Sequence, residues 1–325
     1  MTKKKMAVAA IVAGVILNIL ILLDSSQQLV TQNQVILDWG KKILSCLILD
    51  GLLFGLIHFW EKLTVLPVEL YKNRRLIWKL SINDFKTRFA GSYLGIIWAF
   101  IQPVVTILVY WFVFGVGFRS GQEMAYPFVL YLVAGMVPWL FFSEALNSGT
   151  NALLEYNYLV KKVVFKISIL PIIKILSAAF VHIFFLAFAL VLFSGYGYFP
   201  DLYTLQVIYY SFCLFALVLG LSYATCAVVI FFRDLSQMIS IALQVGVWLT
   251  PIMWDVSIFP EKWRWIFKLN PIYYIVNGYR DALLDKIWFW DHFYFTLYFW
   301  LFTIAAFGFG TLIFKRLKVH FADVL

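Results

Sequence analysis

Apolar segments long enough to cross a bilayer recur along most of this 325-residue chain. A helix needs roughly 20 predominantly apolar residues to span the hydrocarbon core. Charged residues make up 13% of the chain, whereas soluble domains contain roughly 25%. We therefore predict an all-α polytopic membrane protein with eight spans, over residues 6–23, 43–60, 93–118, 127–150, 168–196, 205–231, 236–254 and 292–314.

The basic residues are distributed unevenly between the two sides of these spans. With a cytoplasmic N-terminus, 17 of the 26 Lys and Arg residues lie in cytoplasmic segments and 8 lie outside, while Lys174 lies within a span. Cytoplasmic loops carry such an excess under the positive-inside rule. The distribution predicts that both termini are cytoplasmic, and it accounts for the net charge of +9 without a nucleic-acid partner.

The first two spans form a hairpin, which we expect to occupy residues 1–65 and to precede a larger membrane domain of residues 66–325. The apolar run from Met6 to Leu23 is long for a signal peptide and lacks a small-x-small cleavage site, so a retained helix is favoured. Asp50 lies in the middle of the second span. Intramembrane carboxylates are functional candidates, but neither helix carries a basic partner, which favours packing or hydrogen bonding.

Residues 71–89 have the pattern of an amphipathic helix that lies in the membrane interface. One face holds Tyr71, Trp78, Ile82, Phe85 and Phe89, and its flanks hold Arg75, Lys79 and Lys86 on one side and Arg74 and Arg88 on the other. An apolar face between basic flanks suits anionic head groups. Leu76, Ile77 and Leu80 fall opposite this face, where they suit contact with another protein. A basic linker that only satisfies topology is the alternative.

The following span carries an aromatic stripe of Tyr93, Phe100, Trp111, Phe114 and Phe118, which lie within about 60° of one another on a regular helical wheel. Such stripes often face lipid or the protein core. Aromatic faces also stack on sugars, and many weak contacts permit a chain to slide where a few strong ones would hold it. Gln102-Pro103 predicts a kink in this helix.

The segment between Ser240 and His292 mixes aromatic residues with both charge signs and is interrupted by Pro260 and Pro271. It is too polar to span the bilayer. We expect two short helices that lie in the outer interface or re-enter the membrane, where protein or water must cover non-helical backbone.

The chain lacks the patterns of a nucleotide or metal site. It contains no G-x-x-x-x-G-K-[ST] loop, and its three cysteines and four histidines are scattered. Charges within spans are limited to Asp50, Glu144 and Lys174, whereas ion-coupled carriers usually hold several near the midplane. These absences favour a membrane subunit that is driven by another protein.

The cytoplasmic loop 153–171 has the composition of an element that docks such a partner. A plain connection would not need its combination of charged and apolar side chains, which are Glu155, Lys161, Lys162, Lys166, Tyr156, Tyr158, Leu159, Val163 and Phe165.

Several motifs in order resemble type 2 ATP-binding-cassette exporter permeases, in the subgroup that exports O-antigen, capsular and related polysaccharides or teichoic acids. The motifs are NDFKTRFAGSYLGIIWAFIQPVVTILVYWFVFG (83–115), YLVKKVVFKISILP (158–171), FFRDLSQ (231–237), TPIMWDVSIFP (250–260) and LNPIYYIVNGYRDALL (269–284). The resemblance covers about residues 66 to 320. Two features depart from the family: Lys166 stands where Pro is often found, and the N-terminal spans lie outside the usual six.

The resemblance implies a six-helix core with an amphipathic interface helix and re-entrant outer helices. It further implies a homodimer in the bacterial cytoplasmic membrane, bound to two copies of a separate ATPase that holds ATP and Mg²⁺. The chain itself would be non-catalytic and would need no cofactor. Its substrate would be a lipid-linked polymer, such as an O-antigen, a capsular polysaccharide, a rhamnan or a teichoic acid, that enters from the inner leaflet.

The resemblance also implies roles for residues. The aromatic stripe would line the substrate path. ATP hydrolysis would be transmitted through Glu155, Tyr156, Tyr158, Lys161, Lys162, Phe165, Arg233 and Asp234. The phosphate or pyrophosphate of the lipid carrier would be guided by Arg74, Arg75, Lys79, Lys86 and Arg88.

Two other classes are open alternatives. A membrane-embedded glycan transferase would need an acidic cluster at one membrane face, and the outer candidates are Asp255, Glu261, Asp281, Asp285 and Asp291. A proton-coupled carrier of lipid-linked glycans would work without an ATPase.

Overall fold

The computed structural model describes residues 65–88, 91–119, 125–160 and 166–324, together with scattered residues between 11 and 57. The chain divides into two compact units, residues 1–68 and residues 69–325.

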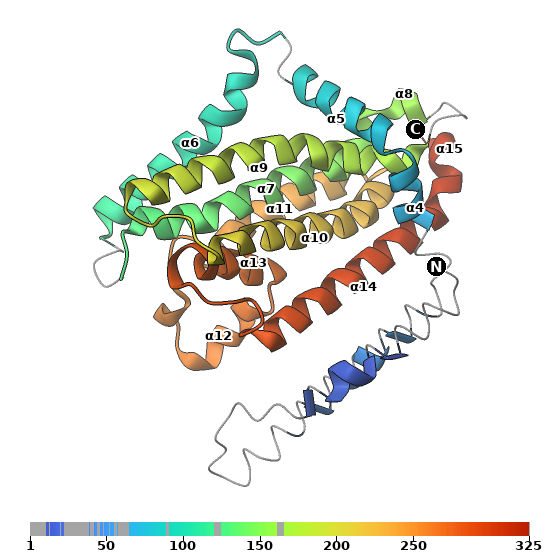
Figure 1. Ribbon diagram of the computed structural model, residues 1–325. Helices are drawn as coiled ribbons and strands as arrows, with labels where there is room; N and C mark the ends of the chain where they lie inside the picture. Colours follow the sequence, from blue (N-terminus) through green and yellow to red (C-terminus); the bar gives the residue numbers. More distant parts are fainter. Residues whose placement is uncertain are drawn as a thin grey trace. The chain divides into compact units, whose positions relative to one another are not determined.

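Helices account for the regular structure of the larger unit (Figure 1). The chain enters this unit through α4 (Val65–Lys72) and α5 (Arg74–Thr87). The inner elements that follow are η1 (Gly95–Ile97), α6 (Trp98–Tyr110), η2 (Trp111–Gly117), α7 (Phe128–Glu155), α8 (Asn157–Val160), η3 (Ile167–Ile169), α9 (Leu170–Gly195), η4 (Tyr203–Leu205), α10 (Gln206–Val229) and α11 (Asp234–Leu249). The remaining elements are η5 (Val256–Ile258), α12 (Glu261–Lys268), α13 (Pro271–Arg280), η6 (Asp281–Asp285), α14 (Phe293–Leu317), η7 (Lys318–His320) and α15 (Phe321–Val324).

Five of the eight expected spans are confirmed as helices long and apolar enough to cross a membrane. Among the described residues these are Gly95–Gly117, Phe128–Glu155, Ile167–Gly195, Tyr203–Val229 and Phe293–His320. The two N-terminal spans fall largely outside the residues that the structure describes.

The seventh expected span, over residues 236–254, is not one continuous helix. Its helix α11 has 16 residues and ends at Leu249, which gives a length of about 24 Å against a hydrocarbon core of roughly 30 Å. Thr250 then adopts an extended conformation with φ −92° and ψ 126°, as proline requires of the residue before it, because Pro251 follows.

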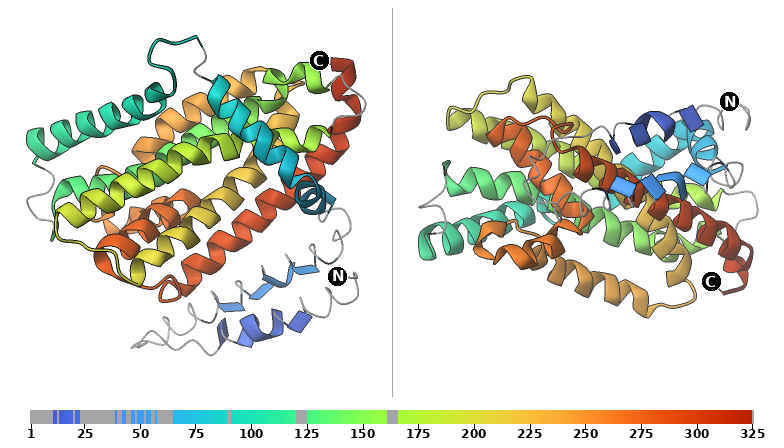
Figure 2. Two further views of the ribbon diagram at one scale, coloured as in Figure 1. Left: turned by 45° about the horizontal axis from the view of Figure 1, so that its top comes forward. Right: turned by 90° about the horizontal axis from the view of Figure 1, so that it is seen from below.

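The core of the larger unit is built around α7, whose spanning window is 78% buried. The helices α9, α10 and α13 pack against α7, and α14 packs along α10 (Figures 1 and 2). By contrast, the windows of Ile167–Gly195 and Gly95–Gly117 are 33% and 6% buried although both are more hydrophobic than that of α7. The central position of α7 is therefore a result of helix packing and does not follow from its hydropathy.

Glycines bring α10 and α14 into close contact. A Cβ atom added at Gly310 would lie 2.4 Å from the carbonyl oxygen of Gly220, and one added at Gly220 would lie 2.8 Å from the Phe307 amide nitrogen. Small residues permit such approaches between membrane helices. This crossing fixes the last span to the core.

The expected irregularity of the first core span has two parts. Pro103 lies within α6, where it lacks the amide that would bond to the carbonyl of Ala99. After Tyr110 the helix continues as a π-helix over Trp111–Gly117. A π-helix holds more residues per turn than an α-helix. Side chains after residue 110 therefore point in directions that a regular helical wheel does not predict.

The segment in which two short helices were expected does contain two, α12 and α13. The residues of α12 are all at least partly exposed, whereas most of α13 is buried. In the smaller unit, the Asn18 amide donates a hydrogen bond of 2.9 Å to Asp50. This contact agrees with the hydrogen-bonding role expected for Asp50.

Candidate functional site

Helix α5 packs against α9 and runs obliquely to the long helices (Figure 1). Its buried residues are Ile77, Ser81 and Asp84, a spacing that places them on one face. Ile77, which the sequence pattern assigned to contact with another protein, is instead buried within this chain and is 3% exposed.

The expected aromatic face of α5 is divided between the protein and the surface. Trp78 and Phe85 contact Phe180 of α9, with ring centroids 5.5 Å and 5.6 Å apart. Tyr71 is exposed, and Phe89 lies outside the described residues. The helix is therefore held to the core by its middle and its C-terminal half.

A charged network joins α5, α9 and the C-terminal end of α7. Lys174 Nζ lies 2.6 Å from Asp84 Oδ1 and 2.5 Å from Glu155 Oε2. The Tyr156 hydroxyl donates a 2.6 Å hydrogen bond to the same Asp84 oxygen, and Lys174 Nζ lies 4.9 Å from the centroid of the Tyr156 ring. Lys174 and Asp84 form a buried ion pair between α9 and α5, and Glu155 and Tyr156 link this pair to the end of α7.

The environment of Asp84 favours its ionised form. Burial alone raises the pKa of this carboxyl, but hydrogen bonds from Lys174 and Tyr156 outweigh burial and hold the pKa below its usual value. The Asp84 and Lys174 side chains are 4% and 9% exposed, whereas Glu155 is 50% exposed. The ionised form of the buried Asp84 therefore depends on Lys174, whereas water also stabilises the half-exposed Glu155 carboxylate.

A second ion pair lies at the C-terminal end of α5. Arg88 Nη1 lies 2.5 Å from Glu144 Oε1 of α7, and the Ser148 hydroxyl donates to the same Glu144 oxygen at 3.0 Å. Arg88 Nη2 also approaches Asp84 Oδ2 at 4.0 Å. Arg88 therefore stands between the buried network and Glu144.

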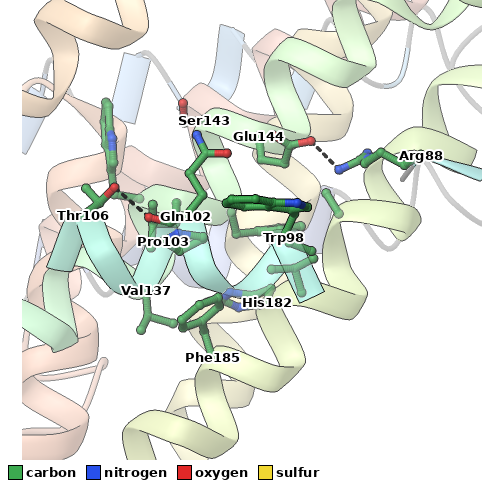
Figure 3. A pocket seen from close by; sticks show the side chains of 16 residues that line it. Arg88, Trp98, Gln102, Pro103, Thr106, Val137, Ser143, Glu144, His182 and Phe185 are labelled. Atoms are coloured by element: carbon green, nitrogen blue, oxygen red, sulfur yellow. Dashed lines mark hydrogen bonds and ion pairs between the residues drawn. The ribbon is translucent and has the colours of Figure 1, made fainter. Parts of the chain in front are cut away.

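A cavity of about 230 Å³ opens beside this pair, between α6, α7 and α9 (Figure 3). Its aromatic walls include Trp98, Trp139, Phe141 and Phe185. Its polar lining residues are Arg88, Gln102, Thr106, Ser143, Glu144 and His182. The Gln102-Pro103 pair noted in the sequence thus lines a cavity whose lining also includes the Arg88–Glu144 ion pair.

The other four basic residues expected near the lipid head group lie elsewhere on α5. Arg74, Arg75, Lys79 and Lys86 are exposed, and none of them lines the cavity. The Arg74 guanidinium lies 4.7 Å from the centroid of the Tyr71 ring. Of the five, only Arg88 is built into the cavity.

The aromatic stripe does not lie along one neighbour. Phe100 packs on Phe184 of α9, with centroids 4.2 Å apart. Phe114 instead lies 6.3 Å from Trp248 of α11 and 5.6 Å from Phe118. The π-helix from Trp111 breaks the 100° periodicity on which the expected stripe rested. Tyr93, Trp111 and Phe118 are exposed.

The expected coupling residues divide into three groups. Glu155 and Tyr156 belong to the charged network, and Tyr158 is exposed. Arg233 and Asp234 are exposed at the start of α11, where the Ser236 hydroxyl donates to Asn151 of α7 at 2.8 Å. Lys161, Lys162 and Phe165 lie outside the described residues.

Asp84, Glu144 and Lys174 are not among the site residues predicted from the sequence. The last two were visible as charges within spans, a signal that marks functional residues. Asp84 was detectable only as a carboxylate seven residues after Ile77 on the same face of a basic helix.

Three of the acidic residues that the sequence predicts on the outer side have partners within the chain. Asp255 caps η5 through Ser257, Asp285 accepts a 2.5 Å hydrogen bond from Tyr126, and Asp281 lies 3.3 Å from His292, which raises the pKa of that histidine. The buried Arg280 guanidinium lies 3.4 Å from the centroid of the Tyr131 ring and donates a hydrogen bond to the Ile252 carbonyl. The Asp281–His292 contact ties η6 to the start of α14.

Five of the described helices are long and apolar enough to cross a membrane, which defines a polytopic membrane protein. Residues 75–284 match the ABC-2 type transporter family, so the chain belongs to that family. An O-antigen export system permease protein of Klebsiella pneumoniae is 24% identical over 247 residues, which cover 75% of this chain and 92% of the relative. A protein of the same name from Myxococcus xanthus is 28% identical over 219 residues, or 67% and 83%. The polysialic acid transport protein of Escherichia coli is 24% identical over 211 residues, or 63% and 80%.

Proposed function

We propose that this chain is the non-catalytic transmembrane subunit of an ATP-driven exporter that moves a lipid-linked polysaccharide across the bacterial cytoplasmic membrane. The observation that carries the proposal is the family match over residues 75–284, with relatives that include an O-antigen export system permease protein and a polysialic acid transport protein. In the complex, a separate ATPase holds ATP and Mg²⁺, two copies of this chain form the path, and both termini face the cytoplasm.

The charged network supports a route from the ATPase to the membrane. The partner docks on residues 153–166 and on the exposed turn at Arg233 and Asp234. Movement of the first segment acts on Glu155 and Tyr156, which contact Lys174 and Asp84 directly. Because Asp84 belongs to α5, the displacement reaches the helix that leads into α6.

The exposed aromatic residues support the substrate path. Trp111 and Trp248 are 40% and 53% exposed, and the apolar surfaces of α6 and α11 around them are uncovered in the single chain. In the dimer, these surfaces line the route between the two copies. Phe114, Phe118 and Tyr93 extend it, and Phe100 contributes where α6 begins.

Co-expression of the chain with ABC ATPases of its own organism, followed by purification through a tag on the chain, tests the proposal. We expect a stable complex with two copies of each subunit, whose ATP hydrolysis rises severalfold when a lipid-linked polysaccharide is added. The ATPase alone serves as the control and should not respond to the polysaccharide. A permease that binds no ATPase would contradict the proposed function.

A further inference from the structure

We propose that the cavity beside Pro103 binds the phosphate-bearing end of a polyprenyl-phosphate-linked substrate through Arg88, and that Glu144 occupies Arg88 until this phosphate displaces it. The inference rests on the proposed function and names the ligand group, its site and the contact that closes the site at rest.

The hydrogen bonds around Arg88 make an exchange of partners feasible. A guanidinium carries five donors and binds phosphate in a bidentate geometry. The described contacts use one short bond, to Glu144, because the approach to Asp84 is 4.0 Å. A phosphate can therefore offer Arg88 more hydrogen bonds than Glu144 does.

Neither carboxylate near Arg88 would be stranded by the exchange. Asp84 keeps the Lys174 ammonium and the Tyr156 hydroxyl, which already bind its Oδ1 atom. Glu144 keeps the Ser148 hydroxyl, and its side chain is 46% exposed, so it can be rehydrated. The large cost of leaving a buried charge unpaired is avoided on both sides.

The cavity has the size and lining for part of such a ligand. Sites that enclose a whole small molecule measure roughly 300–1,000 Å³, so about 230 Å³ accommodates a phosphate with the adjoining chain or sugar unit. Figure 3 shows the Trp98 ring and the Gln102 amide lying near the Arg88–Glu144 pair. Trp98 offers an aromatic face, and Gln102 offers both a donor and an acceptor.

Binding of radiolabelled decaprenyl phosphate to the purified chain in detergent tests the site without any ATPase. We expect Glu144→Gln to tighten binding about two- to fivefold, since it removes a partly exposed competing charge. Arg88→Gln should weaken binding roughly tenfold or more, because it removes charged hydrogen bonds. Arg88→Lys, which keeps the charge, should fall between Arg88→Gln and the wild type. The matched controls Glu261→Gln and Lys262→Gln change exposed residues of α12 and should bind as the wild type does.

Unchanged binding in Arg88→Gln would overturn the site, and unchanged or weaker binding in Glu144→Gln would overturn the displacement by phosphate. Equal retention of phosphatidylglycerol, or full competition by millimolar inorganic phosphate, would overturn the assignment to a polyprenyl-linked ligand. These outcomes are independent of the proposed function. ATP-driven export with none of these binding effects would reject only this site, whereas binding as expected without an ATPase partner would reject only the exporter.

Discussion

Replacing Lys174 by methionine is expected to destabilise the protein by about 3–5 kcal/mol, the range for removing one partner of a buried ion pair. The loss falls on Asp84, which is 4% exposed and would retain only the Tyr156 hydroxyl and the more distant Arg88. The pKa of Asp84 lies below its usual value, so this stabilisation is present above about pH 4 and is lost as the pH falls through the folded-state pKa. Thermal unfolding in detergent at pH 7 measures the change.

A double-mutant cycle separates the ion pair from other effects of the substitution. Lys174→Met combined with Asp84→Asn should recover much of the lost stability, because no buried charge then lacks a partner. The control Lys79→Met changes an exposed residue of α5 and should shift stability by less than about 0.5 kcal/mol. The network would not hold α5 to the core if the stability losses of Lys174→Met and Asp84→Asn simply added in the double variant. A Lys174→Met protein as stable as the wild type would lead to the same conclusion.

Adding one methyl group at Gly310 should destabilise the protein by about 1–3 kcal/mol, the usual cost of overpacking a core. The new Cβ atom would lie 2.4 Å from the Gly220 carbonyl oxygen and 3.1 Å from the Ala224 amide nitrogen. Since both are backbone atoms, α10 and α14 would have to separate. The melting temperature of Gly310→Ala in detergent measures this effect.

Gly195→Ala is the matched control for this crossing. Gly195 ends α9 and has open space around the position of a Cβ atom. We expect this variant to be neutral or slightly stabilised, since alanine restricts the unfolded chain. Equal melting temperatures for the two variants would indicate that α10 and α14 do not depend on their close approach.

Hydropathy located the long core helices because a span must be both long and apolar. The expected segment 168–196, for example, agrees with Ile167–Gly195. The same signal extended α11 past Leu249, because Thr250–Met253 is apolar enough to be buried although Pro251 prevents a helix there. Hydropathy indicates whether a segment avoids water, in lipid or in protein. The backbone conformation before a proline depends instead on local steric clashes.

The aromatic stripe and the charged network show two other limits. A helical wheel assumes a constant angle per residue, and the π-helix at Trp111 violates that assumption without a clear sequence mark. Asp84 and Lys174 are 90 residues apart in sequence, so their pairing arises from the packing of α5 on α9. The charge of Lys174 within a span was visible, but its partner was not.

Reconstituted transport tests the central claim most directly. The chain and its ATPase would be placed in liposomes with a fluorescent polyprenyl-diphosphate-linked oligosaccharide in the leaflet that faces the ATPase. We predict that ATP hydrolysis moves the oligosaccharide into the opposite leaflet. A membrane-impermeant glycosidase added on the ATPase side then no longer reaches it. Omission of either protein should abolish the movement. Movement that needs no ATPase, or its absence from an ATP-hydrolysing complex, would contradict the account.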